Sequence, residues 1–186
     1  LDGSAFTTTP TGVFNWSRDS GSITRPLETD FAAFCIELTQ NVTVTSSYTY
    51  DEAPLADAPV PASVYAPMGA ADAAKIARIY TVWANDTLGS ADLRAAAAKA
   101  AIGETGVGGG DDDLTAGNFL LDTSDGPSND VAIKANAYLI DQAAASPRSG
   151  LFALTSDTAQ DMVVPAPASA ALAATAGLVA TRRRRA

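Results

Sequence analysis

The chain has 186 residues, and 47% of them are apolar, which suits one domain of ordinary size with a substantial core. Outside four arginines at positions 182–185, it carries 21 acidic against 8 basic residues, a net charge of −13. A body this acidic repels nucleic acid and anionic membrane surfaces, so we expect no nucleic-acid partner. There is no histidine and only one cysteine, Cys35. This excludes a histidine-dependent catalytic triad, a zinc site with histidine ligands and an intrachain disulfide.

Strand-forming residues dominate the first fifty positions. Aromatic and β-branched side chains are frequent in residues 12–17, 31–38 and 41–50, so we expect three strands there. Residues 51–68 contain four prolines, which predict an irregular connection.

Three helices are expected next, over residues 69–85, 90–104 and 129–145. The first has an apolar face with helical spacing, and the second begins at Ser90, a good N-cap residue, before a run of alanines. Residues 151–155 and 160–164 are predicted to be closing strands. This order predicts an α+β fold, with a β-sandwich-like body into which a helical segment is inserted.

The C-terminal residues form a three-part pattern. A Pro-Ala motif is followed by an uncharged run, residues 169–181, and then by the arginine cluster. An extended Pro-rich segment suits a processing enzyme, and arginines beside an apolar helix remain on the cytoplasmic side. We therefore predict a body over residues 1–162, with its signal peptide already removed, and a sorting tail over residues 163–186. The residues of the two tail motifs are Val164, Pro165, Ala166, Pro167, Ala168, Arg182, Arg183, Arg184 and Arg185.

The tail resembles the PEP-CTERM sorting signal of Gram-negative bacteria that produce exopolysaccharide, in a VPAPA variant. The resemblance implies an exported protein, anchored transiently in the inner membrane and processed by an exosortase-like enzyme. Its destination would be the cell surface or the extracellular matrix. The candidate partners there are extracellular polysaccharide and the surface of a host or neighbouring cell.

The body resembles the thioester domains of bacterial surface adhesins. Phe34, Cys35 and Ile36 match the strand motif that supplies the thiol, and residues 96–105 (AAAKAAIGET) match a helix motif like AAFQLAIWEI. The resemblance implies an internal thioester between the cysteine and a glutamine, which acylates an amine on a target surface. At the helix position expected to be that glutamine stands Lys99, and Gly103 stands where the motif has Trp.

Lysine has no acyl carbon, so Cys35 and Lys99 cannot form a thioester with each other. The leading interpretation is a non-enzymatic adhesion protein whose thioester-like site, Cys35 and Lys99, is degenerate. The alternative is a functional covalent adhesin in which Cys35 uses another acyl donor, with Gln142 and Gln160 as candidates. A third hypothesis is a secreted enzyme that acts on polysaccharide, since carboxylates are numerous.

Aspartates gather around two glycine-containing turns, at residues 111–113 and 122–130. Such oxygen ligands could bind Ca²⁺, but their spacing does not match an EF-hand loop, and turn formation and helix capping explain them better. We expect no metal site and no cofactor.

Overall fold

The computed structural model describes residues 12–21, 24–25, 27–37, 40, 42–43, 46–60, 66–108, 112–116 and 119–165. Its strands are β1 (Phe14–Ser17), β2 (Asp30–Cys35), β3 (Asp51–Pro54), β4 (Pro59–Val60), β5 (Ala66–Pro67), β6 (Leu151–Thr155) and β7 (Met162–Pro165). Its helices are α1 (Ala70–Asn85), α2 (Ala91–Gly103) and α3 (Gly126–Asp141). Short helical turns are η1 (Leu55–Asp57), η3 (Glu104–Gly108), which is π-helical, and η4 (Gln142–Ala144). The fold is α+β, as predicted, and the three helices stand between β5 and β6 in the chain.

Five strands form one antiparallel sheet in the order β1-β2-β7-β6-β3. Among the described residues, the strand that comes last in the chain, β7, is therefore the central one. Val163 pairs with Phe34 on β2 and with Ala153 on β6, and both Val163 and Val164 are fully buried. The predicted boundary at residue 163 is therefore too early, because the folded body continues through Pro165.

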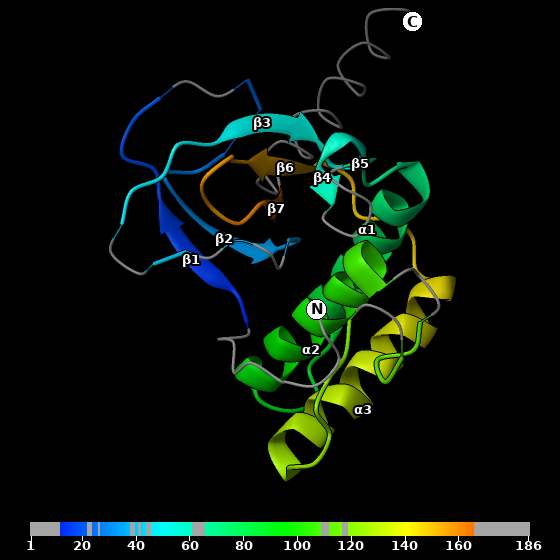
Figure 1. Cartoon of the computed structure of the whole chain (residues 1–186). Helices are drawn as coiled ribbons and strands as arrows, with labels where there is room; N and C mark the ends of the chain where they lie inside the picture. Colours follow the sequence, from blue (N-terminus) through cyan, green and yellow to red (C-terminus); the bar gives the residue numbers. More distant parts are fainter. Residues whose placement is uncertain are drawn as a thin grey trace, which may run out of the picture.

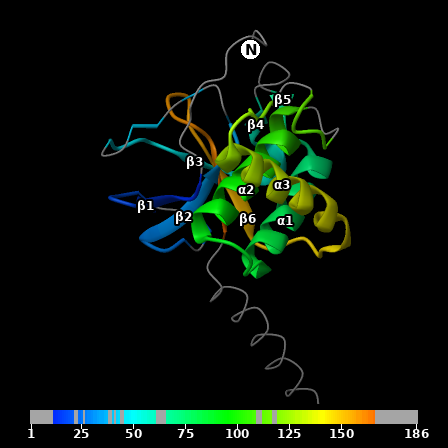
Figure 2. The same cartoon turned by 90° about the horizontal axis from the view of Figure 1, so that it is seen from below.

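The helices lie on one side of this sheet (Figures 1 and 2), and α2 contacts α1, α3 and β2. Every residue of α2 from Ala95 to Gly103 is buried. A helix that is apolar on nearly all sides belongs inside a protein, and the alanines allow close approach of its neighbours. The predicted N-cap is confirmed, since the Leu93 amide donates a 3.1 Å hydrogen bond to Ser90 Oγ.

Two expectations for the middle of the chain are wrong. No strand occurs in the described part of residues 41–50, and residues 51–68 contain β3, η1, β4 and β5 in place of an irregular connection. Prolines favour loops because they lack an amide hydrogen, but β3 is an edge strand, and there Pro54 needs no ladder partner on its open side.

The remaining differences are smaller. Helix α3 begins at Gly126 rather than at residue 129, because the Asp125 side chain accepts a 2.7 Å hydrogen bond from the Ser128 amide and caps the helix earlier. Among the described residues the strands form this five-stranded sheet and the small sheet β4-β5, rather than two large sheets facing each other as in a sandwich.

Most of the predicted sorting tail lies outside the described residues, including Ala166, Pro167, Ala168 and the four arginines Arg182, Arg183, Arg184 and Arg185. Within the described part of the chain, none of the helices has the length and apolar character needed to cross a membrane.

Candidate functional site

Cys35 is the last residue of β2 and pairs with Met162 at the start of β7. The ladder continues for one more step, since the Ile36 amide donates a 2.9 Å hydrogen bond to the Asp161 carbonyl. This pairing brings Gln160, which precedes β7, beside Cys35 although 125 positions separate them in the sequence.

The side chains of Cys35 and Gln160 are in direct contact. Cys35 Sγ donates a hydrogen bond of 3.0 Å to Gln160 Oε1, and Gln160 Nε2 donates one of 3.1 Å to the Glu37 carbonyl. The exposed fractions are 1% for Cys35 and 4% for Gln160. The Tyr50 hydroxyl holds the Gln160 backbone carbonyl with a 3.3 Å hydrogen bond. Both ends of the glutamine amide are therefore fixed, and its carbonyl faces the thiol.

This geometry brings a nucleophile to an acyl carbon. A carbonyl bond is about 1.2 Å long, so Gln160 Cδ lies within about 4.2 Å of Cys35 Sγ. Burial raises the pKa of the Cys35 thiol, while the nearby charge of Lys99 acts in the opposite direction and lowers it. The effect of burial is the larger of the two, so the net pKa of the thiol is raised, with the Lys99 ammonium beside it.

Lys99 also lies at this site, so the structure brings together the two residues predicted from the sequence. Only 4% of Lys99 is exposed, and its Nζ atom lies 5.3 Å from the centre of the Phe14 ring on β1. Phe14 pairs with Ala33, two residues before Cys35, so Phe14 and Cys35 share one face of the sheet. Within the described residues, Lys99 Nζ has no hydrogen-bond partner of ordinary geometry. Burying a charged lysine without such a partner costs free energy of folding. Packing alone therefore does not explain a lysine at this position.

Two buried carboxylates border the Cys35–Gln160 pair, Glu37 and Asp161, each with 2% of its surface exposed. The Asp161 amide donates a long hydrogen bond of 3.4 Å to Glu37 Oε2, and Asp161 Oδ1 accepts one of 2.8 Å from the Ser156 amide. Burial, with help from the charge of Glu37, raises the pKa of Asp161 to about 6. The site therefore has acid groups beside both reacting residues.

The missing tryptophan at Gly103 has a structural counterpart. A Cβ atom placed on Gly103 would lie 2.8 Å from Cε2 of the Phe119 ring, which is too close for an ordinary contact. The ring of Phe119 therefore occupies the space into which a side chain at position 103 would project. A larger residue at this end of α2, just before the π-helical turn η3, would require the Phe119 ring to move.

The other sequence candidates lie elsewhere. Gln142 Oε1 accepts a 2.9 Å hydrogen bond from Arg78 Nε, so this glutamine is bound to α1. Asp112 pairs with Lys75, and Asp113 caps its own turn through Thr115. The described residues contain no group of three or more acidic, cysteine or histidine side chains able to hold a metal ion.

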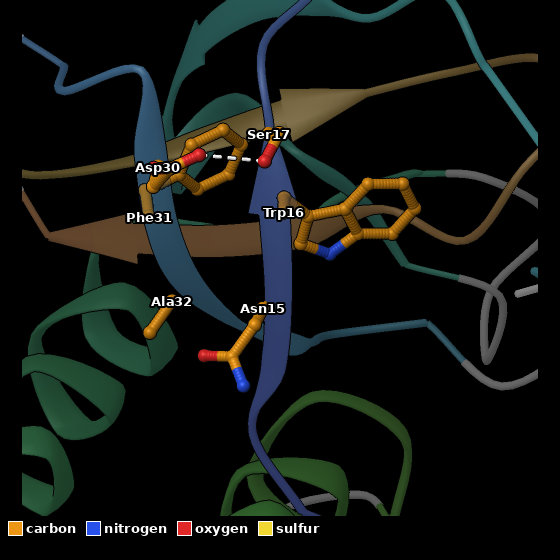
Figure 3. Close-up of a pocket in the computed structure, with 6 residues that line it drawn as sticks. All are labelled: Asn15, Trp16, Ser17, Asp30, Phe31 and Ala32. Atoms are coloured by element: carbon orange, nitrogen blue, oxygen red, sulfur yellow. Dashed lines mark hydrogen bonds between the residues drawn. The ribbon is translucent and has the colours of Figure 1, made fainter. Parts of the chain in front are cut away.

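A surface hollow of about 410 Å³ lies beside β1 and the first half of β2 (Figure 3). Ser17 Oγ donates a 2.6 Å hydrogen bond to Asp30 Oδ1 there. Cys35 is at the opposite end of β2 from Asp30, so this hollow is separate from the thiol. Its lining residues are Asn15, Trp16, Ser17, Asp30, Phe31 and Ala32.

Comparison of the chain with protein-family models, with curated proteins and with solved structures found no match.

Proposed function

We propose that Cys35 and Gln160 form an internal thioester through which this protein attaches covalently to an amine on another surface. The observation that supports the proposal is the buried 3.0 Å contact between Cys35 Sγ and Gln160 Oε1. It favours the covalent alternative, in which Cys35 uses an acyl donor other than position 99, over a degenerate site. The protein would act once, as a reagent, and would not be an enzyme.

The chemistry balances without a cofactor. The Cys35 sulfur attacks Gln160 Cδ, the bond from Cδ to Nε2 breaks, and the departing nitrogen takes the thiol proton and leaves as ammonia. Later an external amine attacks the same carbon, the carbon–sulfur bond breaks, and the thiolate takes a proton from the amine. The products are an amide that joins Gln160 to the target and a free Cys35 thiol.

Burial supports the latency of such a bond. A thioester hydrolyses when water reaches it, and Cys35 and Gln160 are almost completely removed from solvent. The hydrogen bond from Gln160 Nε2 to the Glu37 carbonyl holds the leaving nitrogen away from the sulfur, so the carbonyl carbon is presented to the thiol.

We propose in addition that the C-terminal segment, from the VPAPA motif at residues 164–168 to the arginines at 182–185, sorts the exported chain and anchors it transiently, as substrate of an exosortase-like enzyme. The order of Pro-Ala motif, uncharged run and arginine cluster supports this. The finished protein would be displayed at the cell surface or held in the extracellular matrix.

Capture of a small primary amine tests the proposed function. The full chain is incubated with a biotin-linked alkylamine and then digested, and the labelled peptide is identified by mass spectrometry. We expect one label per chain, on Gln160, together with release of the Cys35 thiol. Cys35→Ala and Gln160→Ala should remove the label.

Gln142→Ala is the matched control, because Gln142 is also buried but is bound to Arg78. It should keep the label. Equal labelling of the native chain and the Cys35→Ala variant would refute the proposal, since the amine would then have entered without the thiol.

A further inference from the structure

Lys99 is the group at this site that the proposed reaction leaves unused. It is 96% buried, and in the described part of the chain its Nζ atom lacks a hydrogen-bond partner of ordinary geometry. Its charge and its contact with the thiol both act on Cys35. A primary amine therefore stands next to the sulfur that would carry the acyl group.

The other two lysines of the chain are held differently. Lys75 pairs with Asp112, and Lys134 pairs with Asp86 at 2.6 Å. Lys99 makes no such ion pair among the described residues, and the aromatic ring of Phe14 and the Cys35 thiol border its amine. Among the three lysines, only Lys99 is placed to reach an acyl group on Cys35.

We propose that Lys99 is the internal acyl acceptor of this site: a thioester that meets no external amine transfers its acyl group to Lys99. The product is an isopeptide bond between Lys99 Nζ and Gln160 Cδ that links α2 covalently to the segment just before β7. This inference rests on the proposed thioester and describes the fate of the unused bond.

The transfer balances within the protein. The transfer starts from the neutral amine of Lys99, after its ammonium has lost one proton to solvent. The amine then attacks Gln160 Cδ, the carbon–sulfur bond breaks, and the leaving Cys35 thiolate takes the second proton. No atom enters or leaves, so the mass does not change.

Lys99 belongs to the same protein as the reactive bond, so the transfer needs no encounter from solution and can proceed whenever no external amine is present. Lys99 therefore limits the lifetime of the reactive bond, and its attack leaves the thiol free but the protein unable to bind a target.

A time course in amine-free buffer tests this inference. Samples of the purified full chain are denatured in acid at intervals, and the intact mass, the number of alkylatable thiols and the sensitivity to hydroxylamine are measured. We expect the mass to stay one ammonia below the sequence mass, while one thiol appears and cleavage by hydroxylamine disappears. Digestion should then yield a peptide pair joined through Lys99 and Gln160.

Lys99→Met and Lys99→Arg remove the nucleophile, and Lys134→Arg is the matched control. The two Lys99 variants should keep a thioester that hydroxylamine cleaves, whereas Lys134→Arg should age like the native chain. If the Lys99 variants do not fold, the joined peptide from the native chain decides the matter on its own.

The possible failures are distinguishable. Thiol release that is accompanied by gain of one water, at equal rates in native and Lys99→Met chains, would overturn the inference and leave the thioester standing. A thioester that persists unchanged in the native chain would do the same. A chain that never loses ammonia would refute the proposed function and this inference together.

Discussion

Truncation after Met162 should unfold the body, whereas truncation after Pro165 should not. The shorter chain lacks Val163 and Val164, which are fully buried in the central strand β7. Burial of one valine side chain contributes about 1.5–3 kcal/mol, so their loss removes about 3–6 kcal/mol before the lost ladder hydrogen bonds are counted. Because a typical domain has a free energy of unfolding of about 5–15 kcal/mol, this loss is severe.

Urea denaturation followed by circular dichroism measures the difference. We expect residues 1–165 to unfold in one cooperative transition with a midpoint close to that of the full chain. Residues 1–162 should show a much lower midpoint or no transition. Equal midpoints for the two truncated chains would contradict the placement of β7 at the centre of the sheet.

Three further predictions concern the buried acid, the glycine before η3 and the tail. Burial raises the pKa of Asp161 to about 6, above an unfolded value of about 4, so the folded state holds an extra proton between these values. The free energy of unfolding should therefore fall by up to about 3 kcal/mol as the pH rises from 4 to 6. Urea titrations of Asp161→Asn should show no such fall. If the variant keeps the pH profile of the native chain, burial of Asp161 does not cause the fall. Gly103→Ala should lower the free energy of unfolding by about 1–3 kcal/mol, because the added Cβ atom collides with Phe119. Gly126→Ala should not, because a Cβ atom there meets no atom within 4 Å. A Gly103→Ala chain that is more stable than the native chain would contradict the close contact between position 103 and Phe119. Neutral residues at 182–185 should weaken retention in the membrane, measured by cell fractionation, and unaltered retention and processing would count against the sorting signal.

The fold class could be predicted because the helices and most strands are indicated by local sequence patterns. The apolar spacing in α1 and the Ser90 cap of α2 are properties of short segments, and these elements occur where expected. Strand β3 could not be found in this way, because its proline is tolerated only by an edge position, and edge position is a property of the whole sheet.

At the site, too, some features are predicted by local sequence patterns and others depend on the whole fold. The motif around Cys35 and the position of Lys99 are visible in the sequence, and the structure brings the two residues together. Gln160 was one of two candidate acyl donors, with no local signal to prefer it to Gln142. Only the pairing of β2 with β7 selects Gln160, and that pairing joins segments separated by 125 positions. The burial of Lys99 could not be predicted from the sequence either. The surrounding residues of the helix are mostly alanine, so no polar face distinguishes exposed positions from buried ones.

The most direct test of the thioester is the intact mass of the freshly purified, untreated full chain. We predict a mass one ammonia below that of the sequence, restored to the full sequence mass in Cys35→Ser. A native chain with the full sequence mass and one thiol that alkylates after denaturation would contradict the account.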